Sequence, residues 1–262
     1  MAEQKGTADV AVGFCLDESG SMSSCWDATI NGFNEYRKSL RKQEGKTTLT
    51  LTKFSAGGGA NFRVVHASQP IKAVTKLDKT TYTPHGGTPL YDAIGHTITE
   101  MDAHLKTLDE QPSVIIVIQT DGFENSSREY TREGIAKLIK RREKKGWKFI
   151  YLGADQDAVT AERVSTGLGV SPGASVVYAA MATDAAFASV GDSTNYVRKS
   201  SIAGQSVSSA AMASNTRTAY EARTGSVVDT PAYTDPNVSP GKDWSWNATL
   251  GYWVHHNTTM GK

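Results

Sequence analysis

A short polar segment after the first apolar run of the chain carries side-chain oxygens that could bind a metal ion. Asp17, Ser19 and Ser21 alternate with other residues directly after the run Val10 to Leu16. That run predicts a buried β-strand, so the three side chains can turn toward one point beyond its end. Carboxylate and hydroxyl oxygens suit Mg²⁺, Mn²⁺ or Ca²⁺, whereas zinc and copper prefer His and Cys. The segment predicts one part of a hard-metal site.

Polar residues that follow a second predicted strand indicate the same site. Val114 to Ile118 is five aliphatic residues in a row, which is typical of a central parallel strand, and Asp121-Gly122 follows it closely. In doubly wound α/β folds, ligands bind at the carboxyl ends of strands where the strand order reverses. If these two strands flank that point, Asp17 and Asp121 face one crevice.

The elements that would position these residues alternate along the chain. The sequence predicts an α/β fold: a doubly wound, mostly parallel Rossmann-like sheet with one antiparallel edge strand and helices on both faces. Thr88 and Pro89 suit the N-cap and first position of one helix. Strands are expected at residues 10–16, 47–54, 61–66, 114–118, 147–152 and 175–178, and helices at about 25–42, 88–108, 129–145, 157–168 and 182–197.

Taken together, these segments carry a family resemblance. Asp17-x-Ser19-x-Ser21, Thr88 within Gly-Gly-Thr-Pro-Leu, and Thr120-Asp121-Gly122 resemble the metal-ion-dependent adhesion site of von Willebrand factor A domains. The likeness covers roughly residues 7 to 202. The sequence Gly-Gly-Thr-Pro-Leu resembles that of stand-alone bacterial and phage members of the family. It implies direct metal ligation by Ser19, Ser21 and Thr88, and support through water from Asp17 and Asp121.

The resemblance implies a function in binding. Neutral hydroxyl ligands leave the metal electrophilic, and Mg²⁺ keeps several waters that a partner's carboxylate can displace. We therefore expect a metal-dependent module that captures a Glu or Asp of a partner protein, with a partner ATPase as one candidate. Mg²⁺ is the expected cofactor, and Mn²⁺ and Ca²⁺ are alternatives. No enzyme is expected, because His85 lies near the site without a triad to join.

Simpler interpretations exist for each residue alone. Ser19 and Ser21 could be turn residues, Thr88 only an N-cap, and Asp121-Gly122 a turn. Their joint occurrence favours the metal site. Asp92 could support Thr88, or could be an exposed acid in the first turn of its helix.

Composition limits the other classes of function. The 262 residues carry a formal net charge of +1, and the basic run from Lys137 to Lys145 suits a solvated helix end, so no nucleic-acid partner is expected. No signal peptide or membrane span is recognisable, so we expect a cytoplasmic protein, or a virion-associated one if a phage encodes it. Cys15 and Cys25 are expected to be reduced and packed.

The end of the chain differs in composition. We expect a domain over residues 1–202, followed over 203–262 by a Ser/Ala/Thr-rich linker or weak surface helix and an irregular Trp-rich tail. The tail aromatics Trp244, Trp246, Tyr252 and Trp253 could cap the domain or dock on a partner. An alternative function follows: a structural or assembly protein, of a phage for example, that forms homo-oligomers through this tail and the metal site.

Overall fold

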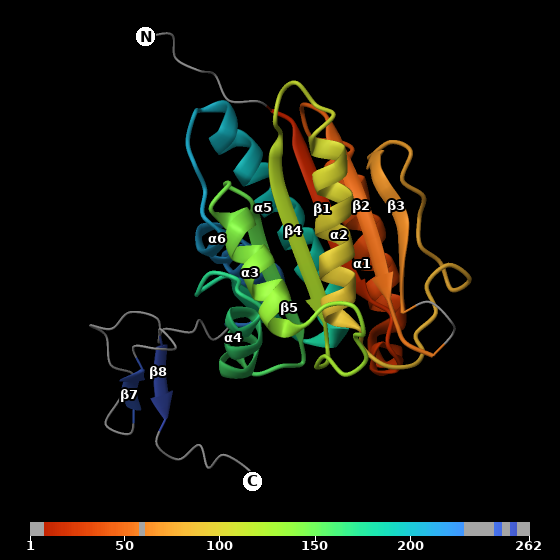
Figure 1. The fold of residues 1–262 in the computed structure, drawn as a ribbon, viewed down its shortest axis with the longest axis vertical. Helices are drawn as coiled ribbons and strands as arrows, with labels where there is room; N and C mark the ends of the chain where they lie inside the picture. Colours follow the sequence, from red (N-terminus) through yellow and green to blue (C-terminus); the bar gives the residue numbers. More distant parts are fainter. Residues whose placement is uncertain (1–7, 58–60, 228–243, 248–251, 256–262) are drawn as a thin grey trace.

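The computed structural model describes residues 8–57, 61–227, 244–247 and 252–255, and within the first two ranges it forms one six-stranded sheet (Figure 1). The strands are β1 (Val10–Asp17), β2 (Thr47–Phe54), β3 (Phe62–Pro70), β4 (Ser113–Thr120), β5 (Lys148–Ala154) and β6 (Ser175–Tyr178). Their order is β3-β2-β1-β4-β5-β6, and every neighbouring pair is parallel except β2 and β3. The predicted fold class is confirmed.

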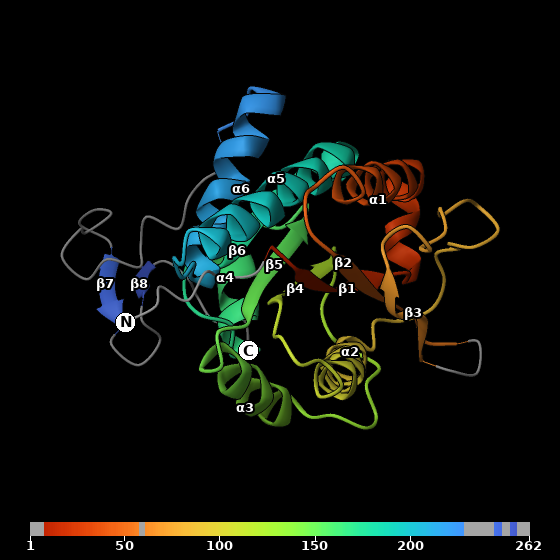
Figure 2. The same ribbon diagram turned by 90° about the horizontal axis from the view of Figure 1, so that it is seen from above.

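Helices cover both faces of this sheet (Figure 2). One face carries α1 (Trp26–Leu40), α5 (Thr183–Ile202) and α6 (Ser209–Thr224), and the other carries α2 (Leu90–Leu105), α3 (Arg132–Glu143) and α4 (Ala158–Gly167). Short 3-10 helices at Gly20–Cys25 and Ala180–Ala182 precede α1 and α5.

Two apolar cores result from the alternation of side chains along the strands. Within β1, Phe14 and Leu16 enter the core under α1 and α5, whereas Ala11 and Cys15 enter the core under α2. Every residue of β1 is buried, as expected for a central strand with helices on both sides. Cys15 and Cys25 are free thiols and buried, as the sequence indicated.

The packed unit continues beyond residue 202: of the linker and the weak surface helix considered for this stretch, a helix forms, and it joins the core. Helix α6 occupies Ser209–Thr224, and its Met212 and Tyr220 belong to the core under α5. The Tyr220 ring lies 6.5 Å from that of Tyr178 in β6, in an edge-to-face arrangement. Ser208 caps the helix by accepting a hydrogen bond from the Ala211 amide.

The aromatic tail contains regular structure where it is described. Strands β7 (Trp244–Asn247) and β8 (Tyr252–His255) form an antiparallel pair with Trp246 opposite Trp253, where the sequence analysis expected irregular chain. The predicted linker and tail residues 228–243, 248–251 and 256–262 lie outside the described residues.

Among the helices that the structure describes, none combines the length and apolar character needed to cross a bilayer.

Candidate metal site

The three predicted segments meet at the carboxyl ends of β1 and β4. These strands are adjacent and parallel in the centre of the sheet, and the chain leaves them toward opposite edges. Asp17 is the last residue of β1, and Asp121 directly follows the last residue of β4. The strand order therefore creates the crevice that the sequence predicted for both carboxylates.

Asp17 lies at the base of this crevice and is fully buried. One carboxylate oxygen accepts a hydrogen bond from the Thr120 hydroxyl at 2.5 Å, and the other accepts one from the Ser19 amide at 2.7 Å. Burial raises the pKa of Asp17 to about 6, although these donors oppose the shift, and the nearby charge of Asp121 adds to it. A carboxylate held this way is stabilised by a positive charge beside it.

The second carboxylate lies at the mouth of the site. Asp121 accepts a hydrogen bond from the Ser21 hydroxyl at 2.7 Å, and the hydroxyl oxygens of Ser21 and Ser19 lie 3.2 Å apart. Burial raises the pKa of Asp121, while the bond from Ser21 lowers it. Neither Asp17 nor Asp121 forms a salt bridge with any residue that the structure describes.

Thr88 brings the third segment to the same point. A Cβ placed on Gly122 would lie 3.6 Å from the Thr88 hydroxyl oxygen and 3.9 Å from that of Ser21. The hydroxyls of Thr88 and Ser21 therefore both border the space above Gly122, which a glycine leaves open. The structure thus brings together all five predicted residues: Asp17, Ser19, Ser21, Thr88 and Asp121.

The predicted capping role of Thr88 is wrong. Helix α2 begins at Leu90, its N-cap position is Pro89, and no side chain caps it there. The backbone of Thr88 instead pairs with Asn125: its amide donates to the Asn125 side chain at 2.8 Å, and its carbonyl accepts from the Asn125 amide at 3.1 Å. Thr88 is therefore tied to the loop that follows Asp121, and its hydroxyl is left for the crevice.

Asp92 holds that same loop. It is buried in the first turn of α2, and its carboxylate accepts hydrogen bonds from the amides of Arg128, Glu129 and Tyr130 at 2.8 to 2.9 Å. Of the two roles considered from the sequence, the exposed acid is excluded. Asp92 supports the site by fixing the loop after β4.

The sequence analysis missed Glu18, which organises the other side of the site. Its carboxylate is almost fully buried and accepts from Lys53 at 2.8 Å, from Arg63 at 3.1 Å and from the Thr83 amide at 2.7 Å. One signal was available: Glu18 directly follows β1 and Lys53 is the next-to-last residue of the neighbouring β2, so both lie near the carboxyl ends of adjacent strands. The Tyr82 hydroxyl also bonds the Asp17 carbonyl at 2.6 Å, so the segment leading to Thr88 is pinned to the end of β1.

The donor set fits a hard divalent cation. Within the described part of the chain, no three His, Cys, Asp or Glu side chains cluster in a way that would hold a metal. An ion in this crevice would rely on three hydroxyls and two carboxylates, which suits Mg²⁺, Mn²⁺ or Ca²⁺. The pair of carboxylates without a salt bridge supplies the negative charge that such an ion would balance.

His85 is engaged in the loop before Thr88. One ring nitrogen lies 2.8 Å from the Thr83 carbonyl oxygen, and the other lies 3.0 Å from the Ser55 hydroxyl. The adjacent Gly86 has a positive φ of 64°, and a Cβ there would collide with the Ala56 carbonyl, so the turn requires glycine. His85 is thus held by its neighbours.

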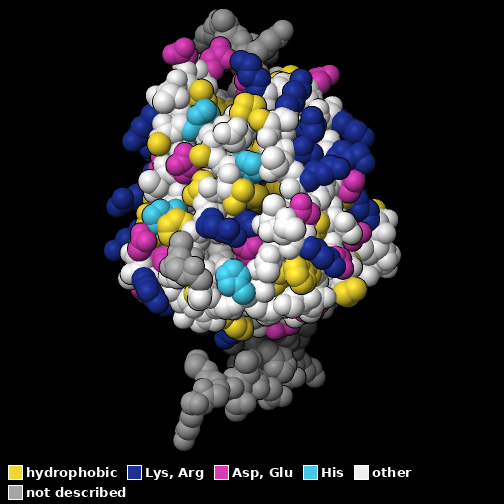
Figure 3. Space-filling view, turned by 90° about the vertical axis from the view of Figure 1, so that its right-hand side faces the viewer, with side chains coloured by type: hydrophobic (Ala, Val, Ile, Leu, Met, Phe, Trp, Pro, Cys, Tyr) yellow, Lys and Arg dark blue, Asp and Glu magenta, His cyan; other side chains and the backbone are white. Residues whose placement is uncertain are grey.

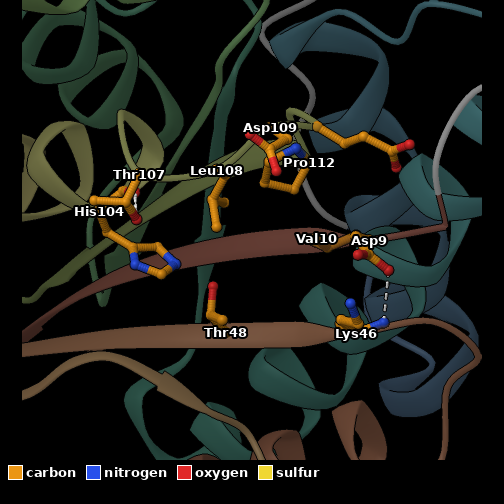
Figure 4. A pocket seen from close by; sticks show the side chains of 10 residues that line it. Asp9, Val10, Lys46, Thr48, His104, Thr107, Leu108, Asp109 and Pro112 are labelled. Carbon is orange, nitrogen blue, oxygen red and sulfur yellow. Dashed lines mark hydrogen bonds between the residues drawn. The ribbon is translucent and has the colours of Figure 1, made fainter.

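A separate hollow of about 480 Å³ lies at the amino ends of the strands, where β1 and β2 begin, opposite the candidate metal site (Figure 4). Its wall includes His104, Leu108 and the carboxylate of Asp9, which accepts from the Lys46 amide at 2.8 Å. None of the five predicted site residues lines it.

Comparisons with known proteins find similarity at the level of structure. No protein-family model and no curated protein matches the chain. The pilus adhesin SpaC from Lactobacillus rhamnosus GG aligns with a TM-score of 0.53 and 16% identity, covering 74% of this chain and 31% of the adhesin. This chain therefore spans about a third of the adhesin's length.

Two further solved structures are similar at lower scores. A von Willebrand factor type A structure from Catenulispora acidiphila has a TM-score of 0.47 and 14% identity, covering 75% of this chain and 43% of that one. The manganese-loaded TRAP protein of Plasmodium vivax has a TM-score of 0.43 and 17% identity, covering 70% and 74%. Together with the strand order, the likeness to the adhesin shows that this chain has a Rossmann-like, doubly wound α/β fold.

Proposed function

We propose that this chain is a metal-dependent protein-binding module of the von Willebrand factor A type. A divalent cation, Mg²⁺ in the first instance, would be held by Ser19, Ser21 and Thr88, with Asp17 and Asp121 acting through water. When bound, the metal supplies an electrophilic centre for a carboxylate of a partner protein. Mn²⁺ and Ca²⁺ suit the same donors.

The observation that carries this proposal is a pair of carboxylates that have no cationic side-chain partner among the described residues. Asp17 and Asp121 are drawn into one crevice, burial raises the pKa of both, and neither has a salt bridge among the described residues. Burying such charges is costly unless something compensates for them. The hydroxyls of Ser21 and Thr88 border the open space beside them, where a cation would find neutral ligands.

Binding is favoured over catalysis by the neighbourhood of the site. His85, in the loop before Thr88, has both ring nitrogens within hydrogen-bond distance of other groups, the Thr83 carbonyl and the Ser55 hydroxyl. Ser55 and His85 lie within hydrogen-bond distance of each other, but Ser55 is buried and no carboxylate among the described residues bonds to the His85 ring, so the third member of a triad is missing there. The alternative of assembly through the C-terminal tail depends mainly on residues outside the described ranges and stays a prediction from the sequence.

Calorimetric titration with Mg²⁺ tests the metal site. Wild type should bind one equivalent, and Thr88→Ala should bind at least ten-fold more weakly because a ligand is removed. Ser24→Ala is the matched control: Ser24 is exposed in the same segment, and its hydroxyl donates to the backbone carbonyl of Ser21 at 3.2 Å. Equal Mg²⁺ affinity in wild type and Thr88→Ala would refute the assignment.

Affinity capture tests the partner. Proteins that bind wild type and Ser24→Ala in Mg²⁺, but not in EDTA and not Thr88→Ala, are candidate partners. One of them should carry an exposed Glu or Asp whose replacement by Gln or Asn abolishes capture. Capture that survives both EDTA and Thr88→Ala would exclude metal-dependent recognition.

A further inference from the structure

A basic hollow lies at the C-terminal end of α1, the end of that helix remote from Ser19 and Ser21. Its volume is about 380 Å³. Five cationic side chains and one anionic side chain line it, so the lining carries a charge of +4, whereas the whole chain carries +1. Figure 3 shows Lys and Arg side chains gathered at the upper right of the face that it presents. The lining residues are Asn34, Glu35, Arg37, Lys38, Arg41, Lys42 and Lys76.

Arg37 is the lining residue whose side chain is held in place by the backbone. The residue is 8% exposed, and its Nε donates to the Val74 carbonyl at 2.5 Å, which anchors the guanidinium. Its terminal nitrogens have no hydrogen-bond partner, and its charge has no carboxylate partner, among the described residues. Burial lowers its pKa, and the charge of Arg41 lowers it further. The Arg37 side chain is thus anchored through Nε while its terminal nitrogens are available at the hollow that it lines, and this arrangement points to a bound anion.

The exposed cations are also largely unpaired. Arg41, Lys42 and Lys76 have no salt bridge among the described residues, and only Lys38 has one, with Glu35 at 3.1 Å. That pair is exposed on both sides and neutralises little in water.

A helix end alone does not account for this charge. Cations in the last turn of a helix complement its dipole, which accounts for Lys38 and Arg41. It does not account for Lys76, which comes from the segment after β3, or for the burial of Arg37.

The lining defines the class of ligand. It contains no aromatic or aliphatic side chain, so its specific contacts would come from charged and hydrogen-bonding groups. The hollow has the size of a small-molecule site rather than an extended groove. Guanidinium groups match the geometry of phosphate oxygens, and a charge of +4 favours a ligand with several negative charges.

We propose that this hollow binds a compact ligand with two or more phosphate groups. The ligand is either a free polyphosphate or a multiply phosphorylated segment of a protein. Binding here does not depend on the metal site.

Calorimetric titration of the full chain with inorganic triphosphate, in EDTA so that no metal chelates the probe, tests the proposal. One equivalent should bind to wild type. The double variant Arg41→Ala/Lys76→Ala should bind at least ten-fold more weakly, and so should Arg37→Met. The double variant changes only exposed side chains, so the test stands even if Arg37→Met does not fold.

Lys140→Ala/Lys144→Ala is the charge-matched control, because it removes two exposed lysines from α3 and its end. It should bind triphosphate as wild type does. A doubly phosphorylated peptide that binds more tightly than triphosphate would identify a protein source, and the reverse order would identify a free polyphosphate. The proposal is overturned if neither probe binds, if the control loses as much affinity as Arg41→Ala/Lys76→Ala, or if hexaglutamate binds as tightly as triphosphate.

Discussion

The ammonium group of Lys53 lies 2.8 Å from the carboxylate of Glu18, and both side chains are only 2% exposed. This pair joins the carboxyl ends of β1 and β2 beside the candidate metal site. Burial lowers the pKa of Lys53, while the hydrogen bond and charge of Glu18 raise it. Lys53 therefore depends on Glu18 to stay charged at its position.

Replacing Glu18 should destabilise the fold strongly. Glu18→Gln leaves the Lys53 charge buried without a carboxylate, and breaking such a pair costs about 3–5 kcal/mol. Urea unfolding measures this free energy. The matched control is Asp27→Asn, which breaks the ion pair between Asp27 and Lys79. These side chains are 71% and 61% exposed, so this substitution should cost less than about 1 kcal/mol. If both variants lose a similar free energy of unfolding, the buried pair contributes no more to stability than the exposed pair.

The stability of the metal-free protein should fall as pH rises from about 4 to about 6. Unfolded Asp17 loses its proton near its ordinary pKa of 3.8, whereas the folded carboxyl keeps it up to about 6. Because the folded state binds more protons in this window, its free energy of unfolding decreases with rising pH. At about 1.4 kcal/mol per pKa unit, the loss is on the order of 3 kcal/mol.

The variant Asp17→Asn isolates this contribution, because it keeps the shape of the side chain without the charge. Urea unfolding in EDTA at several pH values should show Asp17→Asn gaining on wild type across the window. A difference between the two proteins that does not vary with pH would contradict the raised pKa.

Filling the space above Gly122 should weaken metal binding with little effect on folding. In Gly122→Ala, the new Cβ would lie in ordinary contact distance of the hydroxyl oxygens of Thr88 and Ser21. We expect at least a ten-fold loss of Mg²⁺ affinity by calorimetry. Gly167→Ala is the control, since a Cβ there meets nothing within 4 Å. If Gly122→Ala binds Mg²⁺ like Gly167→Ala, the metal does not use this space.

Removing the carboxylate of Asp92 should loosen the loop after β4. Asp92→Ala leaves the amides of Arg128, Glu129 and Tyr130 without their acceptor, and hydrogen bonds to a charged group contribute about 1.5–3 kcal/mol each. Unfolding free energy and Mg²⁺ affinity should both fall. Asp92→Asn keeps one acceptor oxygen and should recover part of each. A variant that is destabilised but binds Mg²⁺ normally would make Asp92 purely structural.

Mg²⁺ itself should stabilise the protein. A ligand that binds only the folded state at 100 times its dissociation constant adds about 2.7 kcal/mol to the free energy of unfolding. Thermal unfolding with and without Mg²⁺ measures this gain. Thr88→Ala, titrated alongside, should gain much less at the same Mg²⁺ concentration.

Most of the sheet could be predicted because short strand-like segments alternate along the chain with segments whose apolar residues have helical spacing. Val114 to Ile118 indicated a central strand, and β4 lies between β1 and β5. The sequence predicted that Asp17 and Asp121 lie close together, because neighbouring parallel strands have their carboxyl ends on the same side. The role of Glu18 could not be read in the same way, since it depends on Lys53 and Thr83 reaching it in three dimensions.

Helix α6 was foreseen only as a weak surface helix, the alternative to a linker, and its packing into the core was not predicted. Its Ser, Ala and Thr residues give a weak apolar signal, so composition favoured a linker. In the fold, these small side chains make polar contacts across helices: the Thr216 hydroxyl donates to that of Ser193 in α5 at 2.7 Å. Arg217 also donates to the Ser175 carbonyl of β6 at 2.6 Å. Packing of this kind is not visible in a pattern of apolar residues.

The position of α6 determines where the protein can be cut. A fragment that ends at residue 202 would lack Met212 and Tyr220, which share a core with Val190 and Val197 of α5. The uncovered apolar face would favour self-association and precipitation. A fragment that ends after Gly225, where a left-handed residue terminates α6, keeps that face covered. The stretch that resembles a connector therefore covers an apolar face of the domain.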